Sequence, residues 1–473
     1  MTFQRPLTFL FHDYETFGIH PGRDRPAQFA GLRTDHELNP IGEPMMFYCR
    51  LPADYLPDPL SCLITGITPQ RANQQGYCEA EFIARIHHAF SEPGTCILGY
   101  NNIRFDDEFT RYTLYRNYFD PYAYSWQNGN SRWDLLDVVR ACYALRPEGI
   151  NWVYDEEGKP SFKLENLTQA NGIGHQNAHD ALSDVHATIG IARMLRQAQP
   201  KLFNYLFELR SKARVKALID IVNMKPLVHV SGMFSPWQGC ASWISPVAWH
   251  PVNPNAVIVV DLARDISPLL ELDAEQIRER LYTRKDDLGE LLPIPVKLIH
   301  INKCPVLAPA ATLSQERAEA LGIDRAMCRT SLDLLRNHPE IREKLTQVFA
   351  TGSEMPEKNQ REAELALYEG FFQDNDKGTM ELVRNSTPQQ LASNRFNFVD
   401  PRLSSMLFRY RARNWPASLL PDEARHWQQH CADYLMNHAD GYTLQLEQLY
   451  EQHANDSSKL AIIKSLAVYL QTL

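Results

Sequence analysis

Residues 7–15 (LTFLFHDYE) decide the fold, because an apolar run leads directly into two carboxylates. The run predicts a strand that is buried at its start. Side chains alternate along a strand, so Asp13 and Glu15 share one face at a spacing of about 7 Å. Two carboxylates so placed repel each other unless a cation lies between them, and Mg²⁺ prefers oxygen ligands. The alternative is a strand end that carries two exposed acids.

Strand and helix patterns are mixed around this stretch. Further strands are expected at residues 28–33, 45–49 and 96–100, and helices at 80–90, from Asp106 onward and at 181–196. In the last of these, apolar residues recur at helical spacing and form one face. We therefore expect an α/β domain over residues 1–200.

The pattern changes after residue 226 to short β-type runs separated by Gly, Pro and Asn. Residues 201–220 are expected to form one connecting helix, and helical patterns return at 314–320 and 331–349. We expect a small β-rich domain with flanking helices over residues 201–352. Residues 352–361 are polar and contain proline, which is typical of a linker. A helical domain is expected over residues 353–473.

The composition narrows the function classes. Hydrophobic residues make up 44% of the 473 residues, which excludes a mostly disordered chain. No long apolar run predicts a membrane span, and no secretory signal is recognisable. The nine scattered cysteines form no C-x-x-C pair, so we expect reduced thiols in a cytoplasmic protein without a zinc site. The net charge of −9 argues against nucleic acid, unless the acidic excess of the first 200 residues includes a cluster that binds metal.

A second group of acids follows the stretch GYNNIRF at residues 99–105. A short apolar strand and a turn rich in Gly and Asn lead to Asp106, where a helix begins. Asp106 could face a metal or cap its own helix, and a cap is the simpler interpretation of this position alone. Asp107 and Glu108 compete with it for the metal role.

The third group is HDALSD at residues 179–184. Asp184 would lie on the first turns of the helix at 181–196, able to face a metal. His179 precedes that helix, and a neutral His beside a metal could take a proton from water. His179 could instead be a surface or capping residue, and Asp180 could be the helix cap.

Together these motifs read D-x-E, N-x-x-F-D and H-x-x-x-x-D, and in that order the sequence resembles the His-containing branch of the DEDD exonuclease superfamily. Longer segments, among them FHDYETFG (11–18), GYNNIRFDDE (99–108) and HINKCPVLA (300–308), resemble the bacterial exodeoxyribonuclease I family over nearly the whole chain. The resemblance implies a ribonuclease-H-like exonuclease domain with a mixed sheet, a Src-homology-3-like β-domain and an α-helical C-terminal domain.

The resemblance also implies an activity. Hydrolysis at the 3′ end of single-stranded DNA would release 5′-mononucleotides, in DNA repair and recombination. Two Mg²⁺ or Mn²⁺ ions would be held by Asp13, Glu15, Asp106 and Asp184, with His179 as general base and Glu15 also at the terminal 3′-hydroxyl. Two alternatives are an RNA-trimming or proofreading exonuclease of the same superfamily and a binding protein with a dead catalytic site.

Aromatic and basic residues interleave around residues 120–133, as single-strand binding requires. We expect Arg111, Tyr122, Trp126 and Arg140 to contact the strand, although half of the aromatic residues there could belong to the core. Phe17 could wedge against the terminal base, and Lys163 in SFKLEN looks like the position of a phosphate-binding cation in the family. Lys212 is a further candidate, as is the arginine run at residues 409–413, although Lys212 could equally lie on a solvated helix face.

The family also docks the acidic C-terminal tail of single-stranded DNA-binding protein, and here the candidate residues are Arg146, Tyr205 and Lys225. Pro309 and Ser314 stand where a basic or amide residue is expected, so one contact with the tail is expected to be lost or moved. The family resemblance implies a monomer, and no membrane partner is expected.

Overall fold

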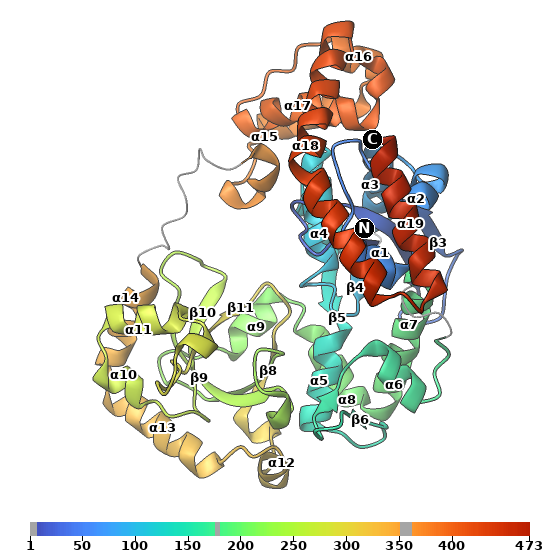
Figure 1. Ribbon diagram of the computed structural model, residues 1–473. Coiled ribbons are helices and arrows are strands. Elements are labelled where there is room, and N and C mark those ends of the chain that lie inside the picture. Colours follow the sequence, from blue (N-terminus) through green and yellow to red (C-terminus); the bar gives the residue numbers. More distant parts are fainter. Residues whose placement is uncertain (1–6, 176–179, 351–361) are drawn as a thin grey trace, which may run out of the picture. The chain divides into compact units, whose positions relative to one another are not determined.

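The computed structural model describes residues 7–175, 180–350 and 362–473 (Figure 1). By their internal contacts the residues fall into two compact units. The first comprises Met1–Ser131, His175–Ile189 and Pro356–Leu473, and the second Arg132–Gly174 and Gly190–Met355. Each unit is described separately.

A five-stranded sheet carries the acids of the first motif. Its strands are β1 (Thr8–Thr16), β2 (Pro26–Thr34), β3 (Met45–Tyr48), β4 (Thr95–Gly99) and β5 (Ser131–Asp134), in the order β3-β2-β1-β4-β5. β1 pairs antiparallel with β2 and parallel with β4, so the sheet is mixed and β1 is its central strand. The predicted strands at 7–15, 28–33, 45–49 and 96–100 are confirmed.

Alternation along β1 separates its apolar and acidic side chains. Leu10 and Tyr14 pack in a core cluster with Phe82 and Ile86 of α3 (Glu79–Phe90). Asp13 and Glu15 therefore point to the opposite face of the sheet.

The first unit also contains α1 (Pro59–Thr65), α2 (Pro69–Gln75) and α4 (Asp106–Arg116). The Asp58 side chain caps α1 and the Thr68 side chain caps α2, in each case with a proline at the first helical position. α7 (Ala181–Ala198) begins in this unit and carries Asp184 in its first turn.

The predicted helical pattern after residue 362 is confirmed by α15 (Asp374–Asn385), α16 (Pro388–Ser393), α17 (Pro401–Asn414), α18 (Pro421–Gln452) and α19 (Ser457–Thr472). α15 to α17 share a core cluster with Tyr115 and Tyr118 at the end of α4. α19 contacts α1, α2 and α18, and Figure 1 shows these helices side by side. The last 110 residues thus complete the core begun by the first 120.

The second unit holds an antiparallel sheet in the order β11-β10-β9-β8-β12. Its strands are β8 (Leu227–Val230), β9 (Ala241–Trp249), β10 (Ala256–Asp261), β11 (Val296–His300) and β12 (Val306–Pro309). Strand β10, which pairs with β9 and β11, is buried along its whole length. A two-stranded ribbon is formed by β6 (Val153–Tyr154) and β7 (Pro160–Ser161).

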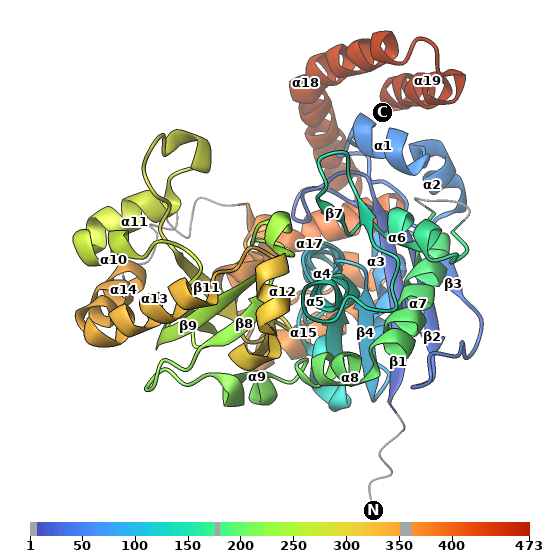
Figure 2. The ribbon, with the colours of Figure 1, turned by 90° about the horizontal axis from the view of Figure 1, so that it is seen from below.

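Helices surround this sheet. They are α5 (Leu135–Leu145), α6 (Leu164–Ala170), α8 (Pro200–Glu208), α9 (Lys212–Leu218), α10 (Ser267–Glu271), α11 (Ala274–Tyr282), α12 (Gln315–Ala320), α13 (Arg325–Asn337) and α14 (Glu340–Ala350). α14 contacts both β9 and α11, beside which it lies in Figure 2.

Two helix predictions were wrong in extent. The single helix expected at 201–220 is two helices, α8 and α9, because the chain leaves the helix at Leu209 and restarts after Ser211. The helix expected at 331–349 is also two, α13 and α14. Pro339 lies between them, and a proline has no N–H to continue the ladder. The predicted linker at 352–361 lies outside the described residues.

All nine cysteines are free; seven are buried, and Cys78 and Cys304 are partly buried. None of the helices in the described ranges combines the length and the apolar content that a membrane crossing requires.

Candidate active site

Three carboxylates from β1 and α7 meet on the acidic face of the sheet. One oxygen from each of Asp13, Glu15 and Asp184 lies within 4.8 Å of the others. The strand supplies two of them because they are two residues apart, and the helix supplies the third from its first turn. The predicted convergence of the first and third motifs is therefore present in the geometry.

Asp106 reaches the same strand. The backbone N–H of Tyr14, between Asp13 and Glu15, donates to Asp106 Oδ1 at 3.0 Å. Asp106 is the first residue of α4 and does not cap it, since Phe105 occupies the cap position without a side-chain bond. Because its carboxylate faces β1, the geometry favours the metal interpretation over the cap.

The two rivals of Asp106 are engaged elsewhere. The Asn102 amide donates to Asp107 at 3.5 Å, and Glu108 pairs with Arg111 at 2.8 Å. Of the three consecutive acids, Asp106 accepts the hydrogen bond from the backbone of β1.

Burial and mutual repulsion shape the charge of this site. Burial, followed by the charges of Asp184 and Asp106, raises the pKa of Glu15 to about 9. Burial, followed by Asp106, Glu15 and Asp184, raises the pKa of Asp13 well above its usual range. Four converging carboxylates with no cation among them are costly, and oxygen-only donors suit a hard divalent ion. The residues present therefore fit a divalent metal site.

The two acids of the third motif, Asp180 and Asp184, have different partners. The N–H of Ser183 donates to Asp180 Oδ1 at 3.1 Å, so Asp180 caps the start of α7, as the alternative interpretation expected. Asp184 faces the site and also lies 2.5 Å from Nε2 of His175. His179, the predicted general base, lies outside the described residues. None of the three sequence motifs contains His175, so it was not predicted as a site residue.

Phe17 follows the acids and is fully buried. Its ring packs in a core cluster with Tyr442, Leu446 and Leu466 from α18 and α19. The predicted wedge against a terminal base stays a prediction, and it requires the ring to leave this core.

Part of the predicted strand-binding set does come together. Arg111 lies over the Tyr122 ring at 5.6 Å, and Tyr122 and Trp126 line a cavity of about 130 Å³. Trp126 is 63% exposed. Tyr124 and Trp133 of the same stretch are core residues. The alternative that half of these aromatic residues are buried is thus correct.

Phe371 completes this cavity and was missed in the sequence. Its ring lies 5.4 Å from that of Tyr122 and is 82% exposed. Only the fold brings residues so far apart in the chain together. The sequence offered one signal of an aromatic surface there, the adjacent pair Phe371 and Phe372.

The remaining strand candidates lie in the second unit. Arg140 pairs with Asp137 at 2.8 Å, and its guanidinium lies against Gly232, where a Cβ would be 2.9 Å away. Lys163 and Lys212 are exposed at the starts of α6 and α9. These three residues are not part of the Trp126 cavity.

Two of the three candidates for the partner tail contact the segment 307–312. Arg146 donates to the carbonyl of Thr312 at 3.1 Å, and the Tyr205 hydroxyl donates to that of Leu307 at 2.8 Å. Lys225 is exposed before β8. Ser314, in the region where a basic or amide residue was expected, caps α12.

The arginine run in α17 is largely paired. Arg411 binds Glu423, Arg413 binds Asp54 and Glu364, and Arg409 binds Glu362 at the surface. A DNA contact of Arg411 or Arg413 would require these pairs to break.

Comparisons with known proteins match the whole chain. Family models match as "Exonuclease" at residues 10–192, "Exonuclease I SH3-like domain" at 210–351 and "Exonuclease I C-terminal domain" at 361–473. The exodeoxyribonuclease I of Escherichia coli is 56% identical, with 98% of each chain covered, and that of Haemophilus influenzae is 50% identical with the same coverage.

Solved structures agree with these matches. The E. coli exonuclease I complex with a dA16 oligonucleotide has a TM-score of 0.97 and 55% identity, covering 98% of this chain and 99% of that one. The zinc-bound E. coli complex with single-stranded DNA has a TM-score of 0.95 at the same identity and coverage. The predicted fold class, with an exonuclease domain, an SH3-like domain and a helical C-terminal domain, is confirmed.

Proposed function

The chain belongs to the exodeoxyribonuclease I family, and from this premise we propose that it hydrolyses single-stranded DNA from the 3′ end at the carboxylate site of β1, α4 and α7. The observation that carries the proposal is the convergence of Asp13, Glu15 and Asp184, with Asp106 bonded to the backbone between the first two.

Each acid has a proposed role. Asp13, Glu15, Asp106 and Asp184 hold two Mg²⁺ or Mn²⁺ ions. When bound, such ions lower the pKa of a water and stabilise the leaving 3′ oxygen. Glu15 also binds the terminal 3′-hydroxyl, and His179 takes the proton of the attacking water. A net charge of −9 is compatible with a polyanionic substrate if the acidic site binds metal, because bound divalent cations attract phosphate.

Single-stranded DNA is the proposed substrate, since E. coli exonuclease I is known in complex with such oligonucleotides. Bases stack on exposed aromatic rings without sequence preference. Tyr122, Trp126 and Phe371 offer that surface, and the Arg111 guanidinium lies over the Tyr122 ring. Arg140, Lys163 and Lys212 are proposed phosphate contacts, and Phe17 a contact of the terminal base. DNA repair and recombination are the proposed setting.

The test compares 3′-labelled and 5′-labelled single-stranded DNA with Mg²⁺. Immediate loss of the 3′ label alone, abolished by Asp184→Ala and by EDTA, is expected. Duplex DNA and RNA of the same sequence run in parallel. Cleavage of RNA in preference to DNA would favour an RNA-trimming enzyme, and binding without hydrolysis would favour a binding protein.

We also propose that the surface around residues 306–312 binds the acidic tail of single-stranded DNA-binding protein. Arg146, Tyr205 and Lys225 are the candidate contacts, and Arg317 adds a guanidinium bonded to the carbonyls of Tyr143 and Ala144. A tail peptide should bind the wild-type protein and bind Arg146→Ala more weakly. An unchanged affinity contradicts this assignment.

A further inference from the structure

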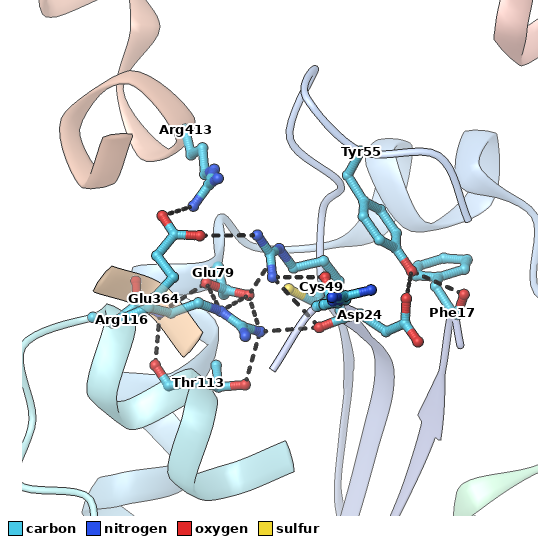
Figure 3. Close-up of polar contacts among 12 residues, drawn as sticks. Phe17, Asp24, Cys49, Tyr55, Glu79, Thr113, Arg116, Glu364 and Arg413 are labelled. Carbon is cyan, nitrogen blue, oxygen red and sulfur yellow. Dashed lines mark hydrogen bonds and ion pairs between the residues drawn. The ribbon is translucent and has the colours of Figure 1, made fainter. Parts of the chain in front are cut away.

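A line of alternating buried charges runs through the first unit. Arg116 of α4 binds both oxygens of Glu79, the first residue of α3, at 2.7 to 3.0 Å. Arg25 at the start of β2 lies 3.8 Å from Glu79 and 3.9 Å from Glu364. These two cations thus meet the carboxylates of Glu79 and Glu364, which come from separate elements (Figure 3).

The line continues into the C-terminal helices. Arg413, at the end of α17, donates to Glu364 at 2.5 Å and binds both oxygens of Asp54 at 2.7 to 3.1 Å. His430 of α18 lies 3.2 Å from Asp54. These carboxylates stay ionised: burial alone would raise the pKa of Glu79, but Arg116 and Arg25 hold it at about 2. Each buried charge has a fixed set of partners, so the line defines the relative positions of α3, α4, α17 and the loop that contains Asp54.

The loop that contains Asp54 also forms hydrogen bonds with the end of β1. The hydroxyl of Tyr55, next to Asp54, lies 2.9 Å from the carbonyl oxygen of Phe17 and 3.0 Å from Asp24 Oδ1 (Figure 3). The N–H of Asp58 donates to the same carbonyl at 2.7 Å, and the N–H of Phe17 donates to the backbone carbonyl oxygen of Arg25 at 2.9 Å.

These bonds matter because the sheet ladder is irregular at this point. The register between β1 and β2 shifts between Glu15 and Thr16. Beyond the shift, the position of the strand end depends on the bonds to Phe17 rather than on regular pairing. Glu15 is two residues away, on the strand that presents the acidic site.

From this arrangement we propose that Tyr55 and Arg413 are positioning residues, through which the C-terminal helices hold the end of β1 and thereby set the affinity of the carboxylate site for divalent cations. The inference rests on the proposed function, because it assumes that Glu15 and its neighbours bind metal. Neither residue touches the substrate or the metal in this scheme.

The experiment measures Mn²⁺ binding by titration calorimetry without DNA, for the wild-type protein and four variants. Tyr55→Phe removes one hydroxyl, and Arg413→Gln removes one cation. Tyr118→Phe is the matched control for the first, because its buried hydroxyl donates to the Leu403 carbonyl at 2.7 Å, away from β1. Arg411→Gln is the matched control for the second, because it removes a buried arginine of the same helix that binds Glu423 through two bonds; no other ion pair of Arg411 is present within the described ranges.

We expect Tyr55→Phe and Arg413→Gln to weaken Mn²⁺ binding by about threefold to tenfold, and the controls to stay within about twofold. Hydrolysis by both variants should recover at saturating Mn²⁺, whereas a general folding defect would not recover. Equal Mn²⁺ affinity in all five proteins, or equal weakening in test and control variants, overturns the inference. A wild-type protein that binds no Mn²⁺ overturns the proposed metal site as well, so the two failures are distinguishable.

Discussion

Two buried glutamates of the first unit should respond in opposite ways to replacement by glutamine. Glu15 and Glu79 are 8% and 9% exposed, so both side chains are largely desolvated. Burial, followed by Asp184 and Asp106, raises the pKa of Glu15 to about 9. At Glu79 the nearby Arg116 and Arg25 outweigh burial and hold the pKa at about 2. The same side chain is therefore costly at one place and stabilising at the other.

The magnitudes follow from proton linkage. Between the ordinary pKa of 4.5 and about 9, folded protein without metal holds a proton on Glu15 that the unfolded chain releases. Stability therefore falls with rising pH, by up to about 1.4 kcal/mol per pH unit and by up to about 3 kcal/mol at pH 7. Coupling to Asp13 spreads this cost over several groups, so Glu15→Gln should stabilise the metal-free protein by about 1 to 3 kcal/mol.

Glu79→Gln has the opposite sign. A depressed pKa gives stability that is present above the unfolded value of 4.5 and is lost as the pH falls through about 2. At neutral pH the substitution leaves Arg116 buried without its bidentate partner, which should cost about 3 to 5 kcal/mol.

The test is urea unfolding in EDTA between pH 6 and pH 8. It gives the free energy of unfolding of the wild-type protein, of Glu15→Gln and of Glu79→Gln. The wild-type protein should lose stability as the pH rises, and Glu15→Gln should show a flatter profile. Adding Mn²⁺ should reverse the order of these two, because only the wild-type site binds the ion fully. Should Glu15→Gln prove less stable than the wild type in EDTA, with an unchanged pH profile, the electrostatic account of the site is refuted.

Three further predictions concern the site and its surroundings. Asp106→Asn should lower hydrolysis at least about 100-fold with the fold intact by circular dichroism, because it removes a ligand charge; near wild-type rates would exclude Asp106 from the metal site. Trp126→Ala and Phe371→Ala should each weaken binding of single-stranded DNA by about fivefold to 100-fold in fluorescence anisotropy without metal, with no loss if the rings do not stack on bases. Gly18→Ala should destabilise the protein by about 1 to 3 kcal/mol in urea unfolding, because its Cβ would lie 2.2 Å from the Asp24 carboxyl group; a neutral effect would show that this turn adapts.

Local patterns predicted the elements that carry the acids. Period-two alternation placed Asp13 and Glu15 on one face of β1, and a helical period placed Asp184 on the first turn of α7. Both predictions depend only on neighbours in the chain. The break at Pro339 was also readable in the sequence, since a proline interrupts the helical ladder.

Long-range contacts decided the rest. Nothing near Asp106 distinguishes it from Asp107 and Glu108, because the deciding bond comes from the backbone of Tyr14, 92 residues away. Phe371 joins Tyr122 only through the packing of the C-terminal helices. Arg413 has the pattern of a solvated or DNA-binding residue, yet its side chain is only 10% exposed, because it pairs with Asp54 and Glu364.

The core around Phe17 sets an order of events during synthesis. Its ring packs in one cluster with Tyr469 of α19, so this part of the core cannot close until the ribosome has added more than 450 further residues. At about 5 to 20 residues per second, that delay is about 20 to 90 s. Throughout that interval the nascent strand β1 has its acids but not the complete core around Phe17. A chain interrupted before α19 should therefore remain an open, protease-sensitive form in which the ring of Phe17 is exposed to water.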